Sequence, residues 1–68
     1  MNHYYVNKRA HAKGKHEVHL TGCVFMPSEK NRYCLGAFKN CAEAVQEARK
    51  FYPRSDFCFF CARKNNQC

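Results

Sequence analysis

The stretch NCAEAVQEARKFYP, residues 40–53, decides the fold, because its pattern predicts one short amphipathic helix. Asn40 is a good N-cap, and Glu43, three residues later, completes the pattern of a capping box. Pro53 ends the helix. The apolar residues recur at helical spacing and form one face, made of Cys41, Ala44, Val45, Ala48, Phe51 and Tyr52.

Strand-like stretches precede this helix. HYYVNKRA and KHEVHL flank Gly14, which stands at a natural turn position, so residues 3–20 are predicted to form a β-hairpin. A loop, TGCVFMPSEKN, separates the hairpin from RYCLGAF, residues 32–38, which predicts a third strand. Gly36 within that strand indicates a bulge or a close backbone approach. The expected fold class is α+β, a small three-stranded antiparallel sheet with one helix packed on it.

The length of the chain limits its core. Sixty-eight residues make one domain, 1–68, in which residues 62–68 are expected to fray. A core of this size rarely contributes more than about 3–5 kcal/mol to the free energy of unfolding. Additional stabilisation by disulfides or a metal is therefore expected, and six cysteines could provide it. The residues expected to form the core are Tyr5, Phe25, Phe38, Phe51, Tyr52 and one of Phe57, Phe59 and Phe60.

Two close pairs of potential metal ligands lie on either side of the third strand and the helix. His19-x3-Cys23 forms the first pair, and Cys58-x2-Cys61 forms the second. Zinc takes four nitrogen or sulfur ligands in a tetrahedron, and structural sites usually offer them as two such pairs. The spacing therefore predicts that one zinc ion closes the α+β unit.

His16 and Cys41 are reserve ligands. In a regular strand His19 points to the opposite side from His16, so His19 faces the core only if the strand ends or bends there. Cys41 lies in the first helical turn, where the helix dipole would stabilise a thiolate, although its position favours a small apolar residue on the helix face. Cys34 is expected in the core, and Cys68 is assigned no role.

The chain is strongly basic. Its formal net charge is +7, from twelve Lys and Arg against five acidic residues, which favours a polyanionic partner, nucleic acid first. Four Tyr and six Phe are many for so short a chain, and exposed ones would suit stacking on bases. The candidate nucleic-acid-binding residues are Lys8, Arg9, Lys13 and Lys15, with Arg32, Arg63 and Lys64 as supplements.

The remaining features of the sequence bear on compartment and chemistry. The first residues lack the apolar run of a signal peptide, and no stretch approaches the roughly 20 apolar residues of a membrane span. A cytoplasmic location is therefore expected, where reduced thiols bind metal more often than they form disulfides. The sequence offers no paired carboxylates and no complete nucleophile and base arrangement, so neither an enzyme nor a small-molecule substrate is predicted.

The pieces VHLTGC, GAF, CAEAVQEA and CFFC, within residues 18–61, together resemble the zinc-binding domain of the Ada-type DNA-repair module and related zinc modules appended to nucleases. The resemblance implies a structural zinc held by the two ligand pairs, with DNA as the neighbour. In the repair module four thiolates hold the zinc, and one accepts a methyl group. His19 stands at the position of that acceptor, and an imidazole cannot accept a methyl group in the same way, so methyl transfer is not expected. The family also has a glycine and an aromatic residue ahead of its second ligand pair, whereas this chain has SDFC there.

These patterns favour a non-enzymatic, zinc-stabilised small basic module that contacts nucleic acid. Two alternatives stay open. One is a protein-interaction or accessory factor without nucleic-acid affinity, and the other is a secreted peptide stabilised by disulfides.

Overall fold

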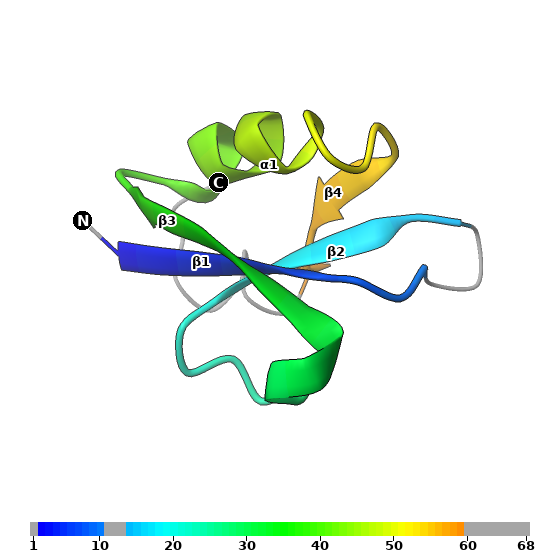
Figure 1. Cartoon of the computed structure of the whole chain (residues 1–68). Helices are drawn as coiled ribbons and strands as arrows, with labels where there is room; N and C mark the ends of the chain where they lie inside the picture. The colour runs from blue at the N-terminus through cyan, green and yellow to red at the C-terminus, as the bar shows by residue number, and fades with distance from the viewer. Residues whose placement is uncertain (1, 11–13, 60–68) are drawn as a thin grey trace.

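The computed structural model describes residues 2–10 and 14–59 of the chain. Within these residues one α-helix lies across one face of a four-stranded mixed sheet, whose strand order is β3-β1-β2-β4 (Figure 1). The predictions for Lys13, Cys61, Arg63, Lys64 and residues 62–68 concern residues outside these ranges. The elements are β1 (Asn2–Asn7), β2 (His16–Leu20), the 3-10 helix η1 (Glu29–Asn31), β3 (Arg32–Phe38), α1 (Cys41–Ala48) and β4 (Ser55–Phe57).

The predicted hairpin is confirmed. β1 and β2 pair antiparallel, with Tyr4 opposite Leu20, and β3 pairs antiparallel with the other edge of β1. The irregularity expected at Gly36 is also present, because Tyr4 lies opposite Gly36 whereas Tyr5 lies opposite Cys34. The extra residue on β3 makes a β-bulge, and Gly36 adopts a φ of 110°, a conformation that side chains disfavour.

The prediction of a three-stranded antiparallel sheet is wrong, because β4 adds a fourth strand that runs parallel to β2. His16 lies opposite Ser55, and Val18 lies opposite Phe57. The chain passes over the sheet through α1 before it returns beside β2, and such a crossover is the usual route to a parallel pair. The sequence pattern missed β4 because it has three residues, begins with serine and includes an aspartate, which together indicate a turn.

The helix begins as predicted. The side chain of Asn40 accepts a hydrogen bond of 3.0 Å from the backbone N–H of Glu43. The Glu43 carboxylate accepts one of 3.2 Å from the N–H of Lys39, one residue before the donor that a capping box uses. α1 ends at Ala48, earlier than the apolar pattern suggested, and the N–H of Tyr52 still donates to the carbonyl of Ala48 at 2.8 Å in the turn that follows.

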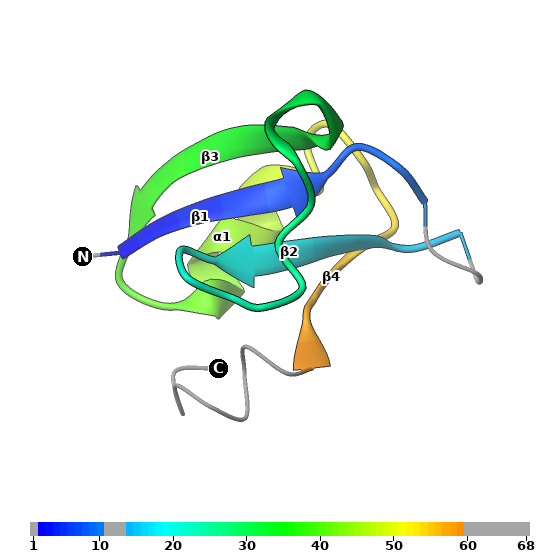
Figure 2. The same ribbon diagram turned by 90° about the horizontal axis from the view of Figure 1, so that it is seen from below.

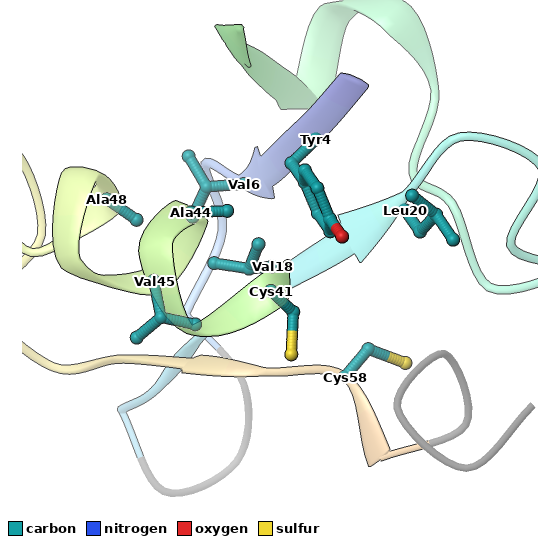
Figure 3. Packing of buried hydrophobic residues seen from close by; sticks show 9 residues of the cluster. All are labelled: Tyr4, Val6, Val18, Leu20, Cys41, Ala44, Val45, Ala48 and Cys58. Carbon is teal, nitrogen blue, oxygen red and sulfur yellow. The ribbon is translucent and has the colours of Figure 1, made fainter. Parts of the chain in front are cut away.

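The hydrophobic core lies between α1 and the sheet and reaches the sheet edge at Cys58, the residue after β4. Its side chains are labelled in Figure 3 and are those of Tyr4, Val6, Val18, Leu20, Cys41, Ala44, Val45, Ala48 and Cys58. The expectation that Tyr5, Phe25 and Phe51 belong to it is wrong, because Tyr5 is half-buried on the other face of β1 and both phenylalanines are exposed. Phe38 and Tyr52 are partly buried and pack against the cluster, as expected.

The sheet face opposite α1 is partly covered by the chain that links β2 to η1. Figure 1 shows this link on the other side of the sheet from α1, and Figure 2 shows it crossing β1 and β2. The link carries Cys23, so this second layer brings a potential ligand to the face on which His19 lies. Neither α1 nor η1, the helical elements of the described residues, has the length and apolar character of a membrane span.

Candidate metal centre

His19 lies on the sheet face that looks away from α1. Its neighbours Val18 and Leu20 belong to the core, and side chains alternate along a strand, so His19 points to the opposite face, across from Tyr5. It is nevertheless only 1% exposed. The strand needs no bend to bury this imidazole, because the link that follows β2 runs along the same face (Figure 2).

A tight turn after β2 positions Cys23. The N–H of Cys23 donates to the carbonyl of Leu20 at 3.0 Å, and the N–H of Thr21 donates to the carbonyl of His3 at 3.1 Å. Gly22 between them has a φ of 91°, which a glycine adopts without the steric cost of a side chain. The turn reverses the chain at once, so Cys23 stays near the end of β2.

Cys58 reaches the same place from the edge of the sheet. Its N–H donates to the carbonyl of Val18 at 2.8 Å, which continues the parallel pairing of β4 with β2 by one residue. This bond sets Cys58 beside His19, and the thiol is buried. The missed strand β4 is therefore the element that brings the second half of the predicted site to the first.

The three side chains form a compact group. One donor atom from each of His19, Cys23 and Cys58 lies within 4.8 Å of the others, so these residues could hold a metal ion. The Sγ atoms of Cys23 and Cys58 are 4.0 Å apart. A tetrahedral ion with metal–sulfur bonds of about 2.3 Å separates two sulfurs by about 3.8 Å, whereas a disulfide would bring them to about 2.05 Å. The observed spacing fits shared coordination.

The electrostatics of the group favour a neutral imidazole. Burial lowers the pKa of His19 below its ordinary value of 6.5, and the nearby carboxylate of Glu17 opposes this shift. Glu17 Oε1 lies 3.8 Å from His19 Nε2. A metal binds the neutral form of histidine, so the buried site holds His19 in the state that coordination requires.

The other candidate ligands lie elsewhere. His16 Nδ1 is 2.9 Å from the carbonyl oxygen of Asn7, and its ring stacks on Tyr52 with centroids 4.0 Å apart, so His16 is outside the group. Cys34 is exposed, and its predicted place in the core is wrong because it faces the same side as Tyr5. Cys41 is buried on α1 and disulfide-bonded, so its role as a reserve ligand stays a prediction for the reduced chain.

The predicted nucleic-acid-binding residues separate into two sets. Lys15 forms an ion pair of 3.7 Å with Asp56, so its charge is partly compensated. Lys8 and Arg9 follow β1, and the N–H of Lys8 donates to the carbonyl of Asn31 at 2.8 Å. This bond joins the end of β1 to η1 and the start of β3.

The residues after β1 and the residues from η1 to the start of β3 therefore adjoin one another. They carry four cations, here named the basic corner: Lys8, Arg9, Lys30 and Arg32.

Lys30 was not among the residues predicted from the sequence. It stands between an acid and a polar residue, in a segment that showed no concentration of charge. Only the pairing of β1 with β3, which sets Asn7 opposite Arg32, brings it near the cations of the hairpin. Lys30 could have been predicted only if the register of β1 with β3 had been known.

Comparisons with protein-family models, with curated proteins and with solved structures found no match for this chain.

Proposed function

We propose that this chain is a small non-enzymatic module that is stabilised by zinc and contacts nucleic acid through its basic surface. The observation that carries the proposal is the meeting of His19, Cys23 and Cys58 within 4.8 Å. These donors come from β2, from the turn after it and from the residue after β4. One ion would therefore join three separate parts of the chain.

The chemistry of the donors favours zinc. Thiolate sulfur and imidazole nitrogen are the usual ligands of structural zinc, whereas calcium and magnesium prefer oxygen. A structural zinc takes four ligands. Cys61, which lies outside the described residues, stays the predicted fourth.

The size of the core explains why the ion would matter. A core in a chain this short supplies about 3–5 kcal/mol, whereas the apparent binding energy of structural zinc in small peptides is roughly 10–16 kcal/mol. Most of the stability would then come from the metal. The fold would depend on coordination more than on packing.

Native mass spectrometry of the chain purified under reducing conditions tests the metal. We expect one zinc per chain, lost in Cys58→Ser and in His19→Ala and kept in Cys34→Ser. Cys34 is a matched control, because it is a free thiol that is exposed and lies outside the group. Equal zinc content in the Cys34 and Cys58 variants would reject the proposed site.

The second half of the proposal rests on charge. A net charge of +7 attracts phosphate, and the logarithm of affinity for phosphates falls linearly with the logarithm of salt concentration. We expect a gel-shift assay with the zinc-loaded chain to retain DNA or RNA at low salt and to release it as salt is raised. Failure to retain either at low salt would reject nucleic-acid contact and leave the zinc site standing.

A protein-interaction role is the alternative, and one observation favours it. Val24 and Phe25, which follow Cys23, are 67% and 62% exposed, and Phe59, which follows Cys58, is 67% exposed. Exposed apolar side chains beside the ligands are typical of a surface that contacts another protein. Capture of a partner that survives nuclease treatment and is lost in Phe25→Ala would support this role.

A further inference from the structure

We infer that the basic corner, together with Tyr5, binds single-stranded nucleic acid, with the phosphates on the cations and one base stacked at Tyr5 and Arg32. The inference rests on the proposed function and assigns it a place and a form of nucleic acid. The place is the part of β1 and β3 that carries the half-buried Tyr5 and Arg32, on the face opposite α1.

The register of the sheet builds this surface. Tyr5 lies opposite Cys34, and Asn7 lies opposite Arg32. Because side chains alternate, these residues share the face that looks away from the core residues Tyr4 and Val6. The N–H of Lys8 donates to the carbonyl of Asn31 at 2.8 Å, so Lys30 of η1 adjoins the cations that follow β1.

The cations of this corner are available to a ligand. None of the four forms an ion pair with an acid in the described part of the chain, in contrast to Lys15 and Lys50, which pair with Asp56 and Glu47. Glu29 is the acidic residue within the two segments that form the corner. Four cations against one carboxylate leave an excess of positive charge, which phosphates complement.

Stacking argues for a single strand. The guanidinium of Arg32 lies over the ring of Tyr5, 4.9 Å from its centroid, and Arg32 also donates to the carbonyl of Pro27 at 3.2 Å. The guanidinium is therefore held over a half-buried aromatic ring, and Arg32 is itself partly exposed. Bases stack on such planes and rings only when they are not enclosed in a duplex.

The test compares two pairs of cations on the zinc-loaded chain. Lys8→Ala with Lys30→Ala removes two charges from the corner, and Lys39→Ala with Lys50→Ala removes the same charge beside α1. The probes are a short oligothymidine, the matching oligouridine and a duplex of equal length. Binding constants are measured at several salt concentrations. We expect the slope of log affinity against log salt concentration to become shallower by about 1.4 in the corner variant and to stay unchanged in the other. The two single strands distinguish DNA from RNA.

A second pair of variants tests the stack. Tyr5→Phe keeps the aromatic ring and should bind as the parent does, whereas Tyr5→Leu should weaken single-strand binding by roughly tenfold. Circular dichroism and zinc content confirm that each variant is folded. An equal loss of affinity in both cation variants would overturn the inference, and so would a duplex bound as tightly as the single strands. Either result would leave nucleic-acid contact intact. Absence of all binding at low salt would overturn the proposed function as well.

Discussion

Glu17 and His19 stand two residues apart on β2, with Glu17 Oε1 3.8 Å from His19 Nε2. Because side chains alternate along a strand, both point to the face on which Cys23 and Cys58 meet. At 3.8 Å the contact is electrostatic rather than a hydrogen bond, and a carboxylate on one imidazole nitrogen leaves the other nitrogen for a metal. Glu17 is therefore in a position to orient His19, although it is not one of the donors in the group.

Glu17→Ala should weaken metal binding, because the imidazole loses the partner that orients it. We expect an affinity about tenfold lower, with Glu17→Gln between this variant and the parent. Competition against a chromophoric zinc chelator measures the affinity. Glu29→Ala is the matched control, since Glu29 is an exposed carboxylate in η1, away from the group. Equal affinity in all three variants would show that Glu17 does not orient the ligand.

Removal of the metal should unfold the chain or lower its melting temperature substantially. The reason is that three of the donors lie on segments that only tertiary structure brings together, and the core alone supplies about 3–5 kcal/mol. Circular dichroism with a zinc chelator, at a constant thiol concentration, checks this expectation. A calcium-selective chelator serves as the control. An unchanged melting curve after complete removal of zinc would mean that packing suffices.

Stability should fall as the solution becomes acidic. Burial lowers the pKa of His19 below 6.5, so between the folded and unfolded pKa values the unfolded chain binds more protons. The contribution of His19 is complete above pH 6.5 and is lost as the pH falls through the window below it. Release of metal from a protonated imidazole acts in the same direction.

Urea unfolding across this pH range, with and without zinc, checks the expectation. His19→Gln, which does not titrate there, should flatten the dependence. A dependence of the same steepness in His19→Gln would assign it to other groups.

The parts of the fold that the sequence predicted are those whose signals are local. The cap at Asn40, the apolar face of α1 and the pairing of the two hairpin strands each depend on residues close in the sequence, and each is present. β4 could not be predicted in this way. Its three residues carry no alternating pattern, and its partner β2 lies on the far side of β3 and α1 in the sequence.

The candidate site was predictable in its members but not in its construction. The spacing His19-x3-Cys23 indicated the first ligand pair, because a short loop can aim two side chains at one point. The second pair supplied Cys58, which joins them in the structure. The link from β2 to η1 runs along the face of His19, and the alternation of the strand does not describe this second layer. Cys34 was misplaced for a related reason, since a strand next to a bulge gives no reliable sign of which face is buried.

The adjacent residues Tyr4 and Tyr5 provide the sharpest check of the sheet register. Tyr4 is 1% exposed and lies in the core near Phe38, with ring centroids 6.3 Å apart, whereas Tyr5 is half-buried on the other face. Tyr4→Ala should therefore cost about 3–5 kcal/mol, the amount expected for a large aromatic removed from a core. Tyr5→Ala should cost much less, since Tyr5 is only half-buried and its cation–π contact with Arg32 is worth about 0.5–1 kcal/mol.

Urea denaturation of the two zinc-loaded variants measures the difference. Because a core of this size supplies only about 3–5 kcal/mol, Tyr4→Ala should fold only while zinc is bound, and Tyr5→Ala should resemble the parent. Tyr4→Phe is the control that keeps the ring and should be close to neutral. If Tyr5→Ala proved the more damaging change, Tyr5 would face the core, and so would His19, which lies opposite Tyr5 in the sheet.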